Sequence, residues 1–77
     1  MMIYKIWEAT LDKKYTVYVE RVEPYKGELT IKDGDKVLTI KAVTISYDAQ
    51  FGPDVADIDE WQRTSINYID NELTKSV

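Results

Sequence analysis

The 77-residue chain contains neither cysteine nor histidine. Without cysteine it has no disulfide and no thiolate nucleophile, which fits a reducing compartment, and without either residue type it lacks the ligands that zinc prefers. The absence of histidine also removes the side chain that most often acts as general acid or base near neutral pH. The composition therefore disfavours enzymes that depend on a nucleophile–base pair.

Glycine is scarce as well. The three glycines, at positions 27, 34 and 52, are isolated, so no glycine-rich loop is available to cradle a phosphate. A serine nucleophile needs a base, and only a lysine is left to serve as one. The fourteen carboxylates offer too many pairs for the sequence to select an acid/base couple. We therefore expect a protein that is not an enzyme and that uses no cofactor and no metal ion.

Long uncharged segments are also missing. Lys5 and Glu8 interrupt the apolar segment MMIYKIWE, so we expect no secretory hydrophobic region there. No uncharged run approaches the about 18 residues of a membrane-spanning helix. With 44% hydrophobic and 31% charged residues, the composition is that of a globular domain. The sequence predicts a cytoplasmic protein without a membrane partner.

The formal net charge of −4 is concentrated in the last third of the chain. Residues 48–77 contain more acidic than basic side chains, whereas residues 1–47 are close to neutral. A negative field disfavours non-specific binding to duplex nucleic acid, because such binding requires lysine and arginine to neutralise phosphates. Nucleic acid is therefore a disfavoured partner.

The first two thirds of the chain have the pattern of β-strands. Four segments are rich in β-branched and aromatic residues: 3–10, 15–22, 28–32 and 36–46. The connections between them are short and polar, and Asp33-Gly34 is the strongest hairpin signal in the chain. In the second segment Val17 and Val19 share one face, and Tyr18 lies on the other. These features predict a four-stranded antiparallel meander.

The last third changes to the period of a helix. At 100° per residue, one set of mainly apolar positions falls within about 80°. These positions are Val55, Ile58, Gln62, Ile66, Ile69 and Leu73. The only surface on which such a stripe can be buried is one face of the sheet. We therefore predict the α+β fold class and a single domain over residues 1–77, with a sheet at about 3–47 and a C-terminal amphipathic helix at about 54–74.

The segment FGPDVADIDEW, residues 51–61, concentrates carboxylates immediately after a Gly-Pro. A metal site is disfavoured, because Asp57 and Asp59 would point about 160° apart on a helix and no glycine falls inside the acidic run. Acidic side chains in a first turn interact favourably with the helix dipole, and Asp57 and Glu60 have capping-box spacing. We interpret the run mainly as a helix start, and an additional role as a partner-facing patch stays open.

Two surfaces are candidates for binding a partner. One helix covers only one face of a four-stranded sheet, so the other face is expected to present aromatic side chains suited to binding. The candidate residues on that face are Tyr4, Tyr18 and Tyr25. The candidates at the acidic helix start are Asp59, Glu60 and Trp61.

A short acidic domain without catalytic groups is expected to be a protein-binding module. We expect a regulator or inhibitor that occupies the surface of a partner macromolecule, of the kind that phages and other mobile elements encode. Two alternatives stay open. The sheet aromatics and neighbouring lysines are compatible with binding single-stranded nucleic acid, although acids are interleaved among them. The protein could instead self-associate, for example as a homodimer, with the open face of one copy closed by another.

Overall fold

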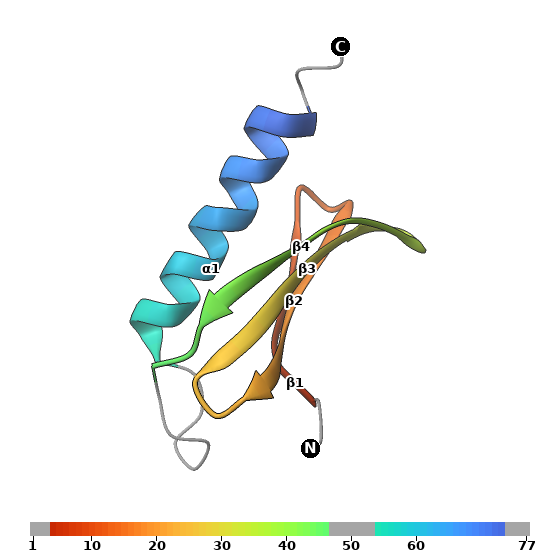
Figure 1. Cartoon of the computed structure of the whole chain (residues 1–77). Helices are drawn as coiled ribbons and strands as arrows, with labels where there is room; N and C mark the ends of the chain where they lie inside the picture. Colours follow the sequence, from red (N-terminus) through yellow and green to blue (C-terminus); the bar gives the residue numbers. More distant parts are fainter. Residues whose placement is uncertain (1–3, 47–53, 74–77) are drawn as a thin grey trace.

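The computed structural model describes residues 4–46 and 54–73. Its elements are β1 (Tyr4–Leu11), β2 (Tyr15–Glu23), β3 (Lys26–Asp33), β4 (Lys36–Thr44), α1 (Val55–Tyr68) and the π-helical turn η1 (Ile69–Leu73). The strands form one antiparallel sheet in the order β1-β2-β3-β4, and α1 lies along one face of it (Figure 1). The predicted α+β fold, a four-stranded meander with one C-terminal helix, is confirmed. The predicted end positions 3, 47 and 74 lie outside the described residues.

Two tight turns join strands through left-handed backbone conformations. Asp12 and Lys13 have φ of 54° and 55°, and the Lys14 amide donates to the Leu11 carbonyl at 3.1 Å. Such paired positive φ values match the twist of a two-residue hairpin. Gly34, in the turn predicted from Asp33-Gly34, has a φ of 62°. Glycine adopts that conformation without the steric cost that a Cβ imposes.

The core lies between the sheet and α1. Val17 and Val19 of β2 and Leu29 and Ile31 of β3 are fully buried there. Trp61 of α1 covers them and is itself fully buried. Its ring lies 5.8 Å from that of Trp7 on β1, tilted by 50°, which is a favourable geometry for an aromatic pair. The helix is therefore fixed to the sheet by its largest side chain.

The rotation of α1 about its axis differs from the predicted one. The buried side chains that follow its sheet-facing side are Asp57, Trp61, Ser65 and Ile69. Val55 is 79% exposed and Ile66 is 44% exposed, so the prediction that both belong to the stripe buried against the sheet is wrong. The side chain of Leu73 lies outside the described residues. At 100° per residue, the observed stripe is rotated by about 80° from the predicted one.

The end of α1 contacts β4, whereas Trp61 contacts β1 at the other edge of the sheet. The Tyr68 hydroxyl donates to the Leu38 carbonyl of β4 at 3.3 Å. The Lys41 ammonium lies 5.5 Å from the centre of the Tyr68 ring. Asp57, at the start of α1, is bonded to Ser46, two residues after β4, so both ends of the helix contact the β4 side of the sheet while Trp61 reaches Trp7 on β1. No described element covers the other face of the sheet.

Both edge strands contain a β-bulge. On β1 the register shifts at Ile6, between the pairs Lys5–Glu20 and Trp7–Val19. On β4 it shifts at Leu38, between the partners of Ile31 and Lys32. A bulge interrupts the regular hydrogen-bonding edge that another strand needs for pairing. The two edges of this sheet are therefore poor templates for strand addition.

Gly27 occupies a position on β3 that has no room for a side chain. A Cβ built there would lie 2.9 Å from the Glu20 carbonyl oxygen and 3.0 Å from Cδ1 of Ile45. Because the first of these atoms belongs to the backbone of β2, we expect Gly27→Ala to lower the free energy of unfolding by about 1–2 kcal/mol. Chemical denaturation measures this change. Lys26→Ala, at an exposed neighbouring position, is the control, and equal effects for both variants would contradict the packing shown here.

Candidate functional site

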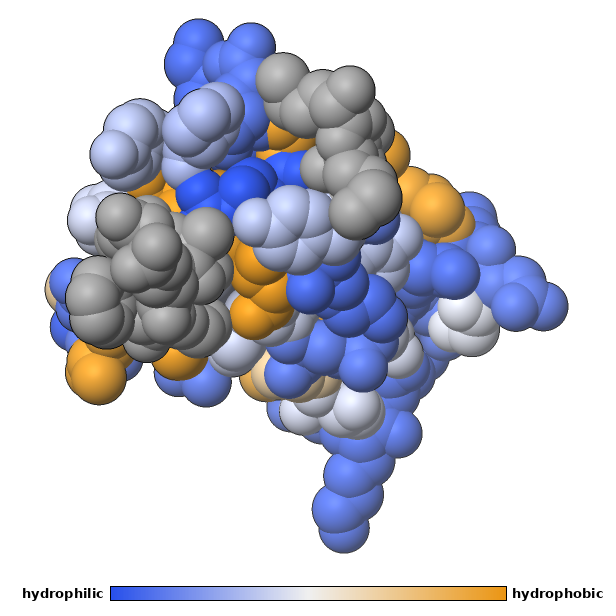
Figure 2. Space-filling model, turned by 90° about the horizontal axis from the view of Figure 1, so that it is seen from below, coloured by the Kyte–Doolittle hydropathy of each residue, from blue (hydrophilic) through white to orange (hydrophobic). Residues whose placement is uncertain are grey.

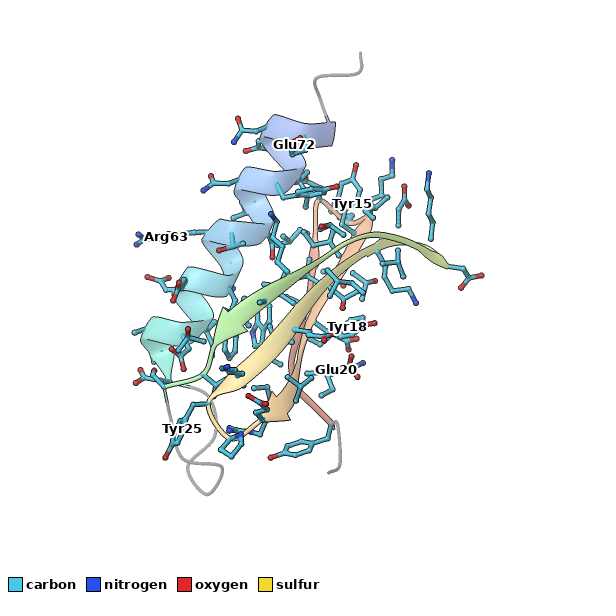
Figure 3. All side chains as sticks on the ribbon, in the orientation of Figure 1. Tyr15, Tyr18, Glu20, Tyr25, Arg63 and Glu72 are labelled. Carbon is cyan, nitrogen blue, oxygen red and sulfur yellow. The ribbon has the colours of Figure 1, made fainter. Side chains whose placement is uncertain are left out.

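The sheet face opposite α1 is open to solvent, and we refer to its residues as the open face. Cross-strand pairing assigns to it Lys5, Glu8 and Thr10 on β1, Thr16, Tyr18, Glu20 and Glu23 on β2, Lys26, Glu28, Thr30 and Lys32 on β3, and Val37, Ile40, Ala42 and Thr44 on β4. Tyr18 and Glu20 project from the side of the sheet away from α1 in Figure 3. The open face therefore includes residues from every strand.

A transverse line of four residues crosses the middle of the open face. Glu8 pairs with Tyr18, Tyr18 with Thr30, and Thr30 with Ile40, and we call these four the central row. Adjacent strands lie about 4.8 Å apart, so the row extends for about 14 Å across the sheet. Thr30 is only 3% exposed, whereas Ile40 is 55% exposed. The row thus presents an apolar end on β4 and an aromatic ring near its middle.

The two bulges determine which edge residues join this face. Val37 and Ile40 are three positions apart, and regular alternation would place them on opposite faces. The extra residue Leu38 brings both onto the open face, where Val37 is 48% exposed. Neither Val37 nor Ile40 was predicted from the sequence to lie on this face. A break in strand alternation is the only signal for them in the sequence, and it does not reveal which residue is bulged.

The bulge at Ile6 likewise brings two residues three positions apart, Lys5 and Glu8, onto the open face. Together they form a charged cluster beside Tyr18. The Lys5 ammonium lies 2.8 Å from a Glu8 carboxylate oxygen and 5.1 Å from the centre of the Tyr18 ring. The hydrogen bond to Glu8 raises the pKa of Lys5 above its ordinary value, and the charge of Glu20 acts in the same direction. Tyr18 is therefore bordered on the β1 side by an ion pair.

A shallow depression of about 270 Å³ opens in this part of the surface. Its lining residues are Lys5, Glu8, Thr16, Tyr18, Glu20, Lys32 and Gly34. The charged side chains of the whole open face are three lysines and four glutamates, so both signs are present and the balance is slightly negative. This arrangement surrounds one aromatic ring with polar and charged side chains, and the exposed aliphatic residues lie apart from it on the edge strand β4.

The structure does not bring the three predicted tyrosines together. Only Tyr18 lies on the open face. Tyr4 pairs with Arg21, whose side chain is buried on the side of the sheet that α1 covers, and Tyr4 itself is 41% exposed. Tyr25 lies in the turn between β2 and β3, at the end of the sheet, and is 63% exposed (Figure 3). The interpretation of these tyrosines as one surface is wrong, because it ignored strand register.

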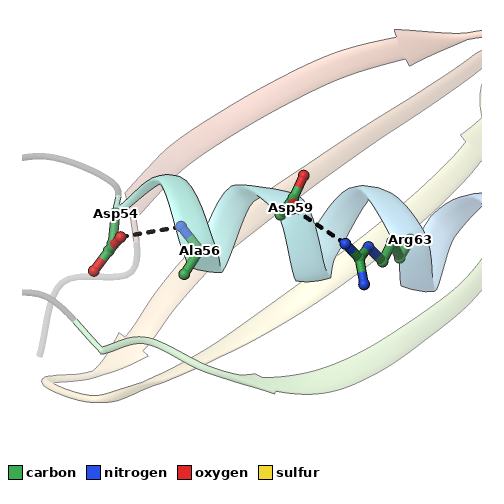
Figure 4. A network of polar contacts seen from close by, with 4 residues as sticks. All are labelled: Asp54, Ala56, Asp59 and Arg63. Atoms are coloured by element: carbon green, nitrogen blue, oxygen red, sulfur yellow. Dashed lines mark hydrogen bonds and ion pairs between the residues drawn. The ribbon is translucent and has the colours of Figure 1, made fainter.

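Three of the four acids at the start of α1 have structural partners. Asp54 is the N-cap and accepts from the Ala56 amide at 3.0 Å, and Asp59 lies 3.4 Å from Arg63 (Figure 4). Asp57 is buried, and its two carboxylate oxygens accept from the Ser46 amide at 2.9 Å and from the Ser46 hydroxyl at 2.6 Å. The predicted start of the helix at about residue 54 is confirmed, because α1 begins at Val55. The predicted capping box is replaced by the link from Asp57 to Ser46, which the sequence did not indicate.

Glu60 and Trp61 differ sharply in their surroundings. Glu60 is exposed, and of the four acids it alone has no hydrogen bond or ion pair within the part of the chain that the structure describes. The interpretation of Trp61 as a surface residue is wrong, because it is fully buried against Trp7. On the end of the molecule seen in Figure 2, the hydrophobic areas are small and interrupted by hydrophilic side chains. The acidic helix start thus lacks the apolar anchor that Trp61 was expected to supply.

No protein family, curated protein or solved structure gives a significant match to this chain. Within residues 4–46 and 54–73, no three acidic side chains converge in a way that would hold a metal ion. In the same residues no helix is long and apolar enough to cross a membrane.

Proposed function

We propose that this protein is a small non-enzymatic protein-binding module, a cytoplasmic regulator or inhibitor that acts by occupying the surface of a partner. The observation that carries this proposal is the composition of the open face. Tyr18 lies near the middle of this face among charged side chains of both signs, and the exposed Val37 and Ile40 lie on the edge strand β4. Aromatic and aliphatic side chains dominate the binding energy of protein–protein interfaces, and charged groups at their rim contribute less.

Binding of single-stranded nucleic acid fits this surface less well. Such proteins combine stacking aromatics with a positive groove that follows the phosphate backbone. The open face offers one aromatic ring, Tyr18, and four glutamates against three lysines. One of those lysines, Lys5, is already engaged by Glu8. We also propose that the protein is encoded by a phage or another mobile element, because small inhibitors of this kind are common there.

The proposal is tested by capture of partners from an extract of the source cells. We expect Tyr18→Ala combined with Ile40→Ser to weaken binding of the captured protein by at least about tenfold, because central aromatic and aliphatic side chains dominate interface energies. The matched control is Asp59→Asn combined with Glu60→Gln on the outer side of α1. If those acids only start the helix, the control binds within about threefold of the unaltered protein.

Each other outcome assigns a different function or surface. Loss of binding in the Asp59/Glu60 variant alone, with a slower association rate and a flatter salt dependence, would move the contact surface to the helix. Capture that disappears after nuclease treatment and falls steeply with salt would favour nucleic acid as the partner. Both variants must first show an unchanged circular dichroism spectrum, so that a binding loss is not caused by unfolding.

A further inference from the structure

We infer that, in the absence of its partner, the open face is closed by the open face of a second copy, related to the first by a two-fold axis along the central row. The inference rests on the same surface as the proposed function. It does not depend on the identity of the partner, because it concerns the protein alone. It makes the free protein a weak dimer whose interface must open before the partner binds.

Opposite charges meet when the open face of a second copy is placed on the first by a 180° rotation about the central row. On β3, Glu28 lies two residues before Thr30, and Lys32 lies two residues after it, all on the same face. Rotation by 180° about the row therefore places Lys32 of one copy over Glu28 of the other, and the reverse contact follows by symmetry. On β4 the same rotation places Val37 over Ala42. The result is two ion pairs around an apolar centre.

The residues on the axis meet their own copies. Tyr18 faces Tyr18 and Ile40 faces Ile40, whereas Thr30 is only 3% exposed and adds little contact, and offset stacking of aromatic rings is favourable. Glu8 also faces its own copy, at the β1 end, where the ion pair with Lys5 neutralises it. The strands of the two sheets then run along nearly the same line, which is the aligned arrangement of two packed sheets.

A rotation about the other in-plane axis, parallel to the strands, does not give this complementarity. That operation exchanges the positions of β2 and β3, so Glu20 of one copy meets Glu28 of the other. Lys32 then faces Thr16 and gains no opposite charge. Pairing through the sheet edges is disfavoured too, because of the bulges at Ile6 and Leu38. The geometry therefore selects the face and the axis together.

The size of the surface indicates a weak association. The central row extends for about 14 Å across the strands, and the residues on either side of it extend the face by about 13 Å along them. A contact of this extent is smaller than a standard stable interface, which buries about 800 Å² per partner. We expect the dissociation constant of the dimer to lie at about 10–100 µM. A weak dimer of this kind is readily displaced by a partner with a larger contact.

The test is a charge exchange between two variants, followed by sedimentation equilibrium from about 5 to 500 µM. Lys32→Glu gives a face with acids at both positions, and Glu28→Lys gives a face with bases at both. Each variant alone is expected to associate at least about tenfold more weakly than the unaltered protein, because like charges then meet across the axis. An equimolar mixture of the two is expected to associate at least as strongly as the unaltered protein.

The combined Lys32→Glu/Glu28→Lys variant is the control for folding and for the pairing itself. Residues 28 and 32 are about 13 Å apart along one strand, so the exchange creates no contact within a copy, and the double variant should regain the original association. A monomer at every concentration, or single variants that associate as well as the unaltered protein, would overturn the inference. So would a mixture that stays monomeric. Partner capture that still depends on Tyr18 and Ile40 would then leave the proposed function standing.

Discussion

Replacement of Trp61 by alanine is expected to remove most of the stability of the protein. The side chain is fully buried, covers the valines of β2 and lies 5.8 Å from the ring of Trp7. Truncation of a large aromatic side chain in a core costs about 3–5 kcal/mol, through lost burial and the cavity left behind. That is comparable with the whole stability of a domain of this length, which is about 5 kcal/mol. Urea denaturation followed by circular dichroism measures the change.

Ile66→Ala is the matched control on the same helix. Ile66 is 44% exposed, so its truncation should cost about 1 kcal/mol or less. The phase of α1 predicted from aliphatic residues alone gives the opposite order, with Ile66 at the centre of the contact. The two variants therefore decide between the two rotations of the helix. A loss for Ile66→Ala that matches the loss for Trp61→Ala would show that α1 is not packed as described.

The second large effect is expected at Asp57. Asp57→Ala removes the acceptor of two hydrogen bonds, one from the Ser46 amide and one from the Ser46 hydroxyl. Each hydrogen bond to a charged group contributes about 1.5–3 kcal/mol when it is partly buried. Because Ser46 is exposed, water can replace part of these bonds once Asp57 is removed. We expect the free energy of unfolding to fall by about 2–3 kcal/mol, measured by chemical denaturation.

A double-mutant cycle separates this link from the general effect of an acid near a helix start. Ser46→Ala should lower the free energy of unfolding by about 1 kcal/mol, because the hydrogen bond from the backbone amide of residue 46 to Asp57 is kept. The double variant should be as stable as Asp57→Ala alone within error. Asp59→Ala should change stability by less than about 0.5 kcal/mol, since its pair with Arg63 is exposed. Additive costs for Asp57 and Ser46 would argue against the hydrogen-bonded link.

The fold was predictable because its local signals agree with one another. Alternation, β-branched residues and the Asp33-Gly34 turn located the strands, and the change of period located the helix. The rotation of the helix was not predictable by counting aliphatic positions, because such a count gives no weight to Trp61, which is fully buried while Val55 and Ile66 are left exposed. Including the aromatic residues would have moved the predicted stripe toward Trp61 and Tyr68, which lie on one side of it around the helix.

The proposed binding surface was only partly predictable, for a different physical reason. Tyr18 was placed correctly on the uncovered side of the sheet, because β2 alternates regularly around it. Val37 and Ile40 were missed because a bulge shifts the alternation by one residue without a distinct sequence mark. Tyr4 was misassigned in the same way, since the bulge at Ile6 reverses the side on which the start of β1 points.

The contact between Trp7 and Trp61 also has a consequence for the order in which the chain folds. Each hairpin of the sheet closes a turn of only a few residues, whereas this contact joins the first strand to the helix across about fifty residues of chain. Short loops close faster than long ones, and local pairings dominate early folding. The sheet is thus expected to form before the helix docks, and the fluorescence of the two indoles should report the late step separately from the strand signal in circular dichroism.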